Sequence, residues 1–180
     1  MKTDNRGFTL IEMIVCLAIF AIVVAAAYGF MLTGALSFNR VNDNAETQIK
    51  SDITMNQLSE CLMNCSAGIT FKNNTLYIIN NDASGGTYTA NIFQFNSDNC
   101  IYFTSVPAVL LSNGSFSCVF TASDLLAKHT QSFSVSLVPD TAGTSAVSAE
   151  IEVLLSYDGH SLSSKRTVAL RNAPPLITVS

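Results

Sequence analysis

Residues 13–39 contain no charged side chain, and this run constrains the fold more than any other feature of the sequence. As a helix it extends about 40 Å at about 1.5 Å per residue, whereas the hydrocarbon core of a bilayer is about 30 Å thick. Lys2 and Arg6 precede the run, so the positive-inside bias leaves this leader in the cytoplasm and sends the remainder outside. The sequence therefore predicts one membrane-spanning helix near the N-terminus, followed by an extracytoplasmic part.

Glu12 breaks the apolar character of this helix at its start. An unpaired carboxylate at membrane depth costs roughly 2.5–3.5 kcal/mol, so a partner cation at the same depth is expected. Cleavage after Gly7 would create such a cation, because Phe8 would then carry the α-amino group of the shortened chain. A neighbouring subunit, staggered along a filament, can place its own Glu12 against that amine.

The residues around Glu12 match a known pattern, which reads Arg6-Gly7-Phe8-Thr9-Leu10-Ile11-Glu12 and runs directly into the apolar segment. This pattern resembles the class III leader of type IV pilins and type II secretion pseudopilins. The resemblance implies that a prepilin peptidase cleaves between Gly7 and Phe8 and methylates Phe8, and that Glu12 assists assembly. It also implies three further partners. These are other pilin or pseudopilin subunits, which bind through the N-terminal helix, the inner or cytoplasmic membrane, and a filament assembly platform.

The resemblance also implies a fold of the α+β class, in which a long N-terminal helix packs on a C-terminal antiparallel sheet. Residues 1–7 then form a leader peptide and residues 8–38 the transmembrane half of the helix. Residues 39–66 form its extracytoplasmic half, and residues 67–180 a β-rich head. The stretch 17–21 and the size of the chain resemble minor, J-like pseudopilins, which implies a place near the filament tip.

An ordinary secretory signal is the competing interpretation of the same N-terminus. Residues 13–24 suit a hydrophobic signal core, and the three alanines at 25–27 suit a cleavage site before Tyr28. Glu12 weakens this interpretation, since an acid at the edge of the signal core hinders insertion. The apolar run also continues beyond the alanines, through Phe30 and Leu36.

Two apolar stripes with helical spacing follow the membrane span. Residues four apart make up the first stripe, Val41, Ala45, Ile49 and Ile53, and a second, rotated stripe consists of Met55, Leu58, Leu62 and Cys65. The change of face near Thr54 predicts a kink or the place where the helix first meets the head. The helix is expected to end between Met63 and Gly68.

Short alternating runs separated by turn residues follow Gly68 and predict β-strands. The candidate strands are 69–72, 75–79, 91–95, 100–104, 116–120, 132–138, 149–157 and 166–171. Polar residues alternate with apolar ones, which indicates an antiparallel sheet with one wet face and an inner face over the helix. Eight runs exceed the four or so strands of the usual pilin sheet, so loops or a second small sheet remain open.

Five cysteines are present, and Cys16 lies alone in the membrane segment. Cys61, Cys65, Cys100 and Cys118 follow the anchor, where an oxidising compartment permits disulfides. A regular helix holds Cys61 and Cys65 too far apart for an easy bridge, so either is a candidate to fasten the helix to the sheet through Cys100 or Cys118. Four cysteines allow three pairings, and the sequence does not choose among them.

The sequence offers no chemistry that points to an enzyme, a cofactor or a metal site. Neither His129 nor His160 lies in a catalytic motif, and Asp140 and Asp158 do not amount to a calcium ligand set. With a net charge of −4 and a pI of about 4.9, binding to nucleic acid is not expected. The alternative function is that of a competence-type pilin whose head binds DNA or a surface ligand.

Overall fold

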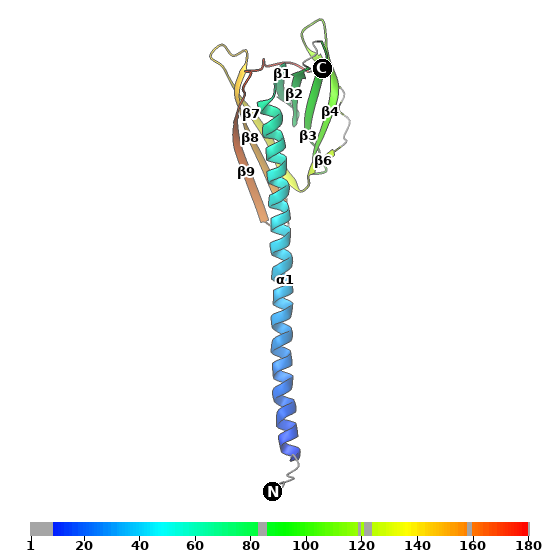
Figure 1. Cartoon of the computed structure of the whole chain (residues 1–180), viewed down its shortest axis with the longest axis vertical. Coiled ribbons are helices and arrows are strands. Elements are labelled where there is room, and N and C mark those ends of the chain that lie inside the picture. Colours follow the sequence, from blue (N-terminus) through cyan, green and yellow to red (C-terminus); the bar gives the residue numbers. More distant parts are fainter. Residues whose placement is uncertain (1–8, 83–85, 119, 121–123, 158–159, 180) are drawn as a thin grey trace, which may run out of the picture. The chain divides into compact units, whose positions relative to one another are not determined.

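The computed structural model describes residues 9–82, 86–118, 120, 124–157 and 160–179. It contains one long helix, α1 (Leu10–Met63), and nine strands within these residues. The strands are β1 (Gly68–Lys72), β2 (Thr75–Asn81), β3 (Tyr88–Phe95), β4 (Ile101–Leu110), β5 (Phe116–Ser117), β6 (Asp124–Ala127), β7 (Thr130–Pro139), β8 (Ala146–Tyr157) and β9 (His160–Ala169). This is an α+β fold with antiparallel sheets, as expected (Figure 1).

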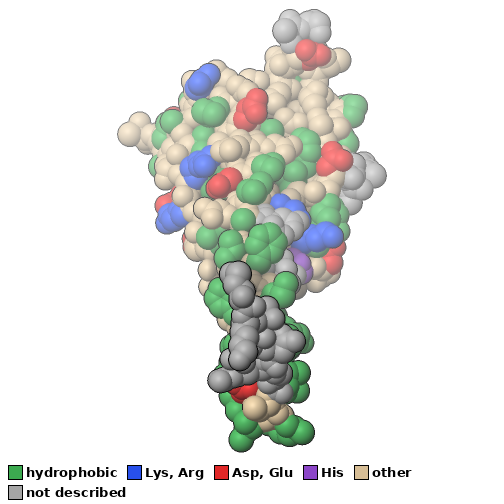
Figure 2. Space-filling view, turned by 60° about the horizontal axis from the view of Figure 1, so that its bottom comes forward, with side chains coloured by type: hydrophobic (Ala, Val, Ile, Leu, Met, Phe, Trp, Pro, Cys, Tyr) green, Lys and Arg blue, Asp and Glu red, His purple; other side chains and the backbone are tan. Residues whose placement is uncertain are grey.

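The chain divides into two compact units, Met1–Ala45 and Glu46–Ser180. In the described part of the first unit the helix carries its apolar side chains outward: Phe20 is 67% exposed and Phe30 84%. The segment Leu10–Phe38 is long and apolar enough to span a membrane. In Figure 2 most of the coloured helix surface is hydrophobic, whereas charged side chains are scattered over the head among hydrophobic and other ones.

The second unit contains the end of α1 and two sheets. Within the described residues, one sheet has six strands in the order β1-β2-β3-β4-β5, with β6 also pairing with β4, and the other has the order β7-β8-β9. Every strand pair is antiparallel. The second small sheet that the sequence left open is therefore present.

The helix enters the core of the second unit at the place that the sequence indicated. Thr54 is fully buried, and the stripe that begins at Met55 is at most 2% exposed at Met55, Leu58 and Leu62. These residues share one core cluster with residues of both sheets, among them Phe93 and Ile151. Figure 1 shows the last turns of α1 over the two sheets.

The first apolar stripe does not join this core. Ile49 is 58% exposed and Ile53 55%, although the helix is already in contact with β9 through the hydroxyl groups of Ser51 and Ser164, 2.7 Å apart. The two stripes lie on different faces of α1, and only one face can lie against the sheets. The expectation that the inner face of the sheet covers an apolar stripe thus holds for the second stripe alone.

A second, smaller core lies on the opposite face of the six-stranded sheet. Successive strand residues point to opposite faces, so Ile78 joins the core with the helix while Ile79 joins the second cluster. Phe116 of β5 belongs to this cluster, and Ile177 of the C-terminal tail packs against it.

The tail, residues 174–179, holds the two sheets together by backbone hydrogen bonds. The Ile69 amide donates to Pro175, and the Ile177 amide donates back to Ile69, at 3.0 and 3.2 Å. On the other sheet, the Ala146 amide donates to Pro174 at 2.9 Å. Gly68 allows this approach, since a Cβ there would lie 2.5 Å from Cγ2 of Ile177.

Several predicted strand bounds were wrong. The sequence missed β6 entirely, began a strand at Cys100 that begins at Ile101, and ended it six residues before Leu110. It extended β5 to Phe120, and it placed the last strand at 166–171, whereas β9 is His160–Ala169. Strand formation here depends on pairing with distant neighbours, which residue preferences express weakly.

Candidate functional site

The candidate site is the first turn of α1, where Thr9 immediately precedes the helix and Glu12 lies in its first turn. The Thr9 amide donates a hydrogen bond of 2.8 Å to Oε2 of Glu12, and the Thr9 hydroxyl donates another of 2.8 Å to the same oxygen. In return the Glu12 amide donates to Oγ1 of Thr9 at 3.4 Å. This reciprocal arrangement is a capping box.

The capping box offsets part of the free-energy cost of placing Glu12 at membrane depth. Backbone N–H groups at a helix start have no partner within the helix, and a carboxylate there satisfies one of them and interacts favourably with the helix dipole. Such a cap is worth about 1 kcal/mol. Glu12 therefore has an internal partner within its own subunit, whether or not a neighbouring amine is present.

Sequence reasoning assigned no role to Thr9. The spacing Thr9-x-x-Glu12, directly before an apolar run, is the signature of a capping box and was a usable signal. Gly7 and Phe8, the predicted cleavage and methylation positions, lie outside the described residues. The pairing of Glu12 with a Phe8 amine therefore stays a prediction.

Comparison with known families assigns this region. The family model of the prokaryotic N-terminal methylation motif matches residues 2–28. This chain carries the N-terminal methylation motif of type IV pilin-like proteins. The motif is characteristic of the class III leader of type IV pilins and pseudopilins, and it includes Gly7, Phe8 and Glu12. No curated protein and no solved structure shows a significant match to the chain.

The matched motif indicates a broad class of protein. It implies processing by a prepilin peptidase and assembly with other pilins. Together with the apolar helix Leu10–Phe38, it indicates a membrane-anchored protein of the structural, pilin type.

The four cysteines predicted as disulfide partners lie in different surroundings. All five cysteines belong to the described residues and are free thiols. Cys61 and Cys65 lie in the core with the helix, Cys118 packs against the second core on the other face of the sheet, and Cys100 precedes β4. A disulfide among them stays a prediction.

The thiol of Cys65 is the most deeply buried of the four. It donates to the carbonyl oxygen of Gly68 at 3.3 Å, just beyond the end of α1. Burial raises the pKa of Cys65 to about 12, and burial together with the charge of Glu60 raises the pKa of Cys61 to about 11. Both thiols are therefore protonated and unreactive at neutral pH.

Asp140, one of the two candidate calcium ligands, is engaged in its own loop. Oδ1 of Asp140 accepts hydrogen bonds from the amides of Thr144 and Ser145, at 3.0 and 3.3 Å, and so stabilises its own loop. Asp158 lies outside the described residues. The part of the chain that the structure describes contains no group of three or more His, Cys, Asp or Glu placed to hold a metal ion.

Proposed function

We propose that this chain is a structural subunit, a pilin or minor pseudopilin, of a type IV pilus-like or type II secretion-like filament. The observation that carries the proposal is the methylation motif leading directly into a capped, exposed apolar helix. In this proposal the peptidase cleaves between Gly7 and Phe8 and methylates Phe8. Glu12 of one subunit then meets the Phe8 amine of a neighbour.

The exposed helix surface supports assembly through α1. Removing apolar surface from water is favourable by roughly 25 cal/mol per Å². Exposure of side chains such as Phe20, Phe30 and Met31 to water is therefore unfavourable. Lipid covers them before assembly, and neighbouring helices cover them in a filament. The exposed side chains of Ile49 and Ile53 extend the apolar surface beyond the span, where no lipid tail reaches, which favours helix neighbours there.

The proposed topology is a single pass through the cytoplasmic membrane. Residues 1–7 form the cytoplasmic leader, 8–38 the transmembrane half of the helix, and 39–66 its extracytoplasmic half. Residues 67–180 form a head outside the membrane, which assembly carries into an envelope or surface filament. The resemblance of stretch 17–21 to J-like pseudopilins supports a minor subunit near the filament tip.

The competence-type alternative receives less support from the head surface. Of the basic residues near the C-terminal strand, Lys165 forms an ion pair with Glu150 at 2.7 Å. Arg166 donates to Asn56 and Ser59 of α1, at 2.8 and 3.3 Å. Binding to DNA depends on cations available to replace counterions, and these two are already engaged within the subunit.

A matched pair of variants tests the proposal. In cells that contain a prepilin peptidase, Gly7→Ile should abolish shortening of the chain, because it replaces the glycine after which the peptidase is proposed to cut with a bulky residue. Ala27→Ile, which would block an ordinary signal cut before Tyr28, should leave shortening unchanged. Immunoblots of membranes with and without the peptidase measure both, and the opposite pattern would assign the chain to ordinary secretion.

A further inference from the structure

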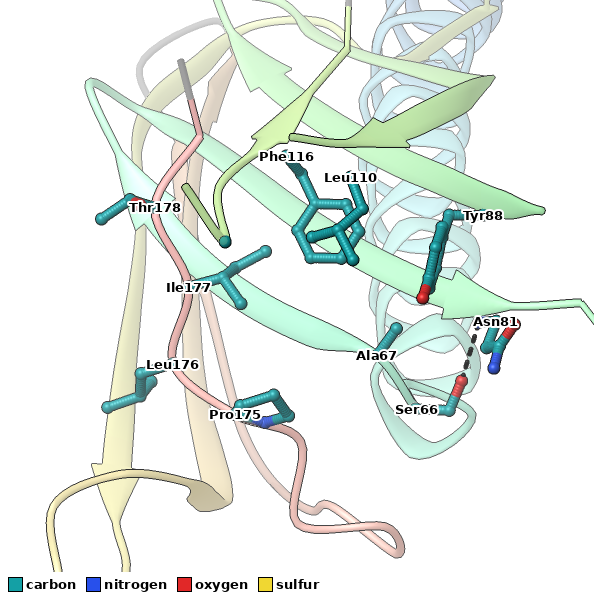
Figure 3. Close-up of a pocket in the computed structure, with 11 residues that line it drawn as sticks. Ser66, Ala67, Asn81, Tyr88, Leu110, Phe116, Pro175, Leu176, Ile177 and Thr178 are labelled. Atoms are coloured by element: carbon teal, nitrogen blue, oxygen red, sulfur yellow. Dashed lines mark hydrogen bonds between the residues drawn. The ribbon is translucent and has the colours of Figure 1, made fainter. Parts of the chain in front are cut away.

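A pocket of about 520 Å³ opens at the end of the head where α1 ends (Figure 3). Four chain segments far apart in sequence build it: the α1–β1 loop with Ala67, the facing ends of β2 and β3 with Tyr88, the β4–β5 turn with Phe116, and the tail with Ile177. Its volume lies within the range of about 300–1,000 Å³ that is typical of small-molecule sites.

Backbone hydrogen bonds hold each wall of this pocket in place. The Ala67 amide donates to Ile79 at 2.9 Å, and the Phe116 amide donates to Thr178 of the tail at 3.1 Å. The Ile177 amide donates to Ile69 at 3.2 Å. A site formed in advance loses little conformational freedom when it binds a ligand.

The apolar side chains form the sides of the pocket. Tyr88 and Phe116 meet edge to face, with their ring centroids 5.1 Å apart. Leu110 and Leu176 remain 46% and 40% exposed at the rim. In Figure 3 Ile177 lies on the side of the pocket opposite Tyr88.

Polar groups gather at one end of the pocket. The Ser66 hydroxyl oxygen accepts a hydrogen bond of 3.0 Å from the Asn81 amide of the main chain. This leaves the hydroxyl hydrogen of Ser66 and the exposed side-chain amide of Asn81 to serve a ligand. Figure 3 shows the Tyr88 hydroxyl directed toward this same end.

None of the described residues that line the pocket carries a charge. We propose that the pocket binds an uncharged sugar ring of a glycan. A pyranose ring presents a flat face of C–H groups and a rim of hydroxyl groups. The aromatic and aliphatic sides of the pocket match the first, and Ser66, Asn81 and Tyr88 match the second.

The mixture of apolar and polar side chains in the pocket favours a sugar over an apolar peptide side chain. A peptide anchor would bury the Asn81 amide and the Tyr88 hydroxyl without satisfying them, at a cost of about 1–3 kcal/mol per group. A neutral ring with hydroxyl groups at its rim satisfies both. The site lies outside the first turn of α1, so this inference does not depend on filament assembly.

The test uses the full-length protein in lipid nanodiscs, because sugar-headed detergents would compete. The probes are three neutral trisaccharides, cellotriose, maltotriose and fully N-acetylated chitotriose, and saturation-transfer NMR and calorimetry measure their binding. We expect at least one to bind. Asn81→Ala should weaken the binding of that trisaccharide about tenfold through the loss of a hydrogen bond, and Tyr88→Phe should weaken it several-fold.

Gln131→Ala is the matched control, since it removes an exposed side-chain amide next to Thr130, at the other end of the head. It should leave binding unchanged, whereas Leu110→Trp, at the exposed rim, should abolish binding by filling the pocket. Thermal unfolding of each variant checks that the head is folded. The proposal is overturned if no trisaccharide binds at millimolar concentration, if Asn81→Ala binds as well as the unaltered protein, or if only an apolar peptide probe binds.

Discussion

At the residue scale, Glu12 has one partner in the structure, the start of its own helix, and a second in our proposal, the amine of a neighbour. The capping box with Thr9 makes the carboxylate tolerable in a free subunit, and the Phe8 amine is its proposed partner in the filament. We expect Glu12→Ala to be cleaved normally but to enter filaments at least about tenfold less, since an amine–carboxylate pair in lipid is worth more than one hydrogen bond. Sheared filaments and membranes, compared by quantitative immunoblot, measure the ratio.

Thr9→Val is the companion variant for this prediction. It removes both hydrogen bonds of the Thr9 hydroxyl but retains the main-chain hydrogen bond from Thr9 to Glu12, so incorporation should fall less than in Glu12→Ala. Equal incorporation of Glu12→Ala and the unaltered chain would contradict the assembly role of this carboxylate.

Gly68 is required by close packing against the tail. A Cβ at this position would lie 2.5 Å from Cγ2 of Ile177 and 2.9 Å from its Cδ1. Gly68→Ala should therefore destabilise the protein by about 1–3 kcal/mol, the usual cost of overpacking. Chemical denaturation of the full-length protein in detergent measures this loss.

The double variant Gly68→Ala with Ile177→Ala separates overpacking from other effects of the alanine. Removal of the Ile177 methyl groups makes room for the new Cβ, so the two substitutions together should cost less than the sum of each alone. Strict additivity would contradict the contact between the tail and β1.

Burial of Cys65 makes the free energy of unfolding depend on pH in the alkaline range. Its ordinary pKa of 9.0 rises to about 12 in the folded protein because the thiol is buried. The unfolded chain loses this proton first as pH rises, so the stabilisation is complete below about pH 9 and is lost toward pH 12. The loss is at most roughly 1.4 kcal/mol per pH unit.

Cys65→Ala should show a shallower fall in unfolding free energy over this window than the unaltered protein. Cys100→Ala, at the half-exposed thiol before β4, should retain the steep fall. Denaturation at a series of alkaline pH values compares the slopes, and identical slopes for the two variants would show that the Cys65 thiol is not buried as described.

At the element scale, the two apolar stripes of α1 have different surroundings. Met55 and Leu58 are buried by the sheets of the same subunit, whereas Ile49 is 58% exposed. Ile49→Asp should leave the head folded but reduce filament incorporation at least about tenfold, because a charge would enter a helix–helix contact. Gln48→Asp adds the same charge at an exposed neighbouring position and should assemble better. Equal incorporation of the two variants would place Ile49 outside the subunit contact.

The helix could be predicted from the sequence in much more detail than the sheets. The apolar run, the change of stripe near Thr54 and the end after Met63 all follow from a period that acts within a few residues. By contrast, β9 begins with His160 and three nearby serines, which have little strand preference of their own. Its register against β8, with Ser164 opposite Val153, depends on contacts that local patterns do not encode.

The candidate site and the pocket show the same difference. Gly7, Phe8 and Glu12 belong to one short motif that can be read from the sequence, although their roles stay predictions, and Thr9 also had a local signature. Ala67, Tyr88, Phe116 and Ile177 are brought together only by the fold of the head. No sequence pattern links residues so far apart.

The whole molecule combines a pilin-type anchor with a head whose tail holds two sheets together. Anchor and leader follow from the matched motif, and the head gives the subunit its surface outside the membrane in our proposal. In our proposal, an apolar helix that is stable only in lipid or against other helices couples membrane insertion to assembly. Processing at the leader is therefore the step on which the rest of this account depends.

Intact mass and N-terminal sequencing of the protein from native membranes test that step most directly. The account predicts a chain that begins at Phe8 and carries one added methyl group on its α-amine. A chain that begins at Tyr28, without a methyl group, would mean ordinary secretion and would contradict the filament-subunit function.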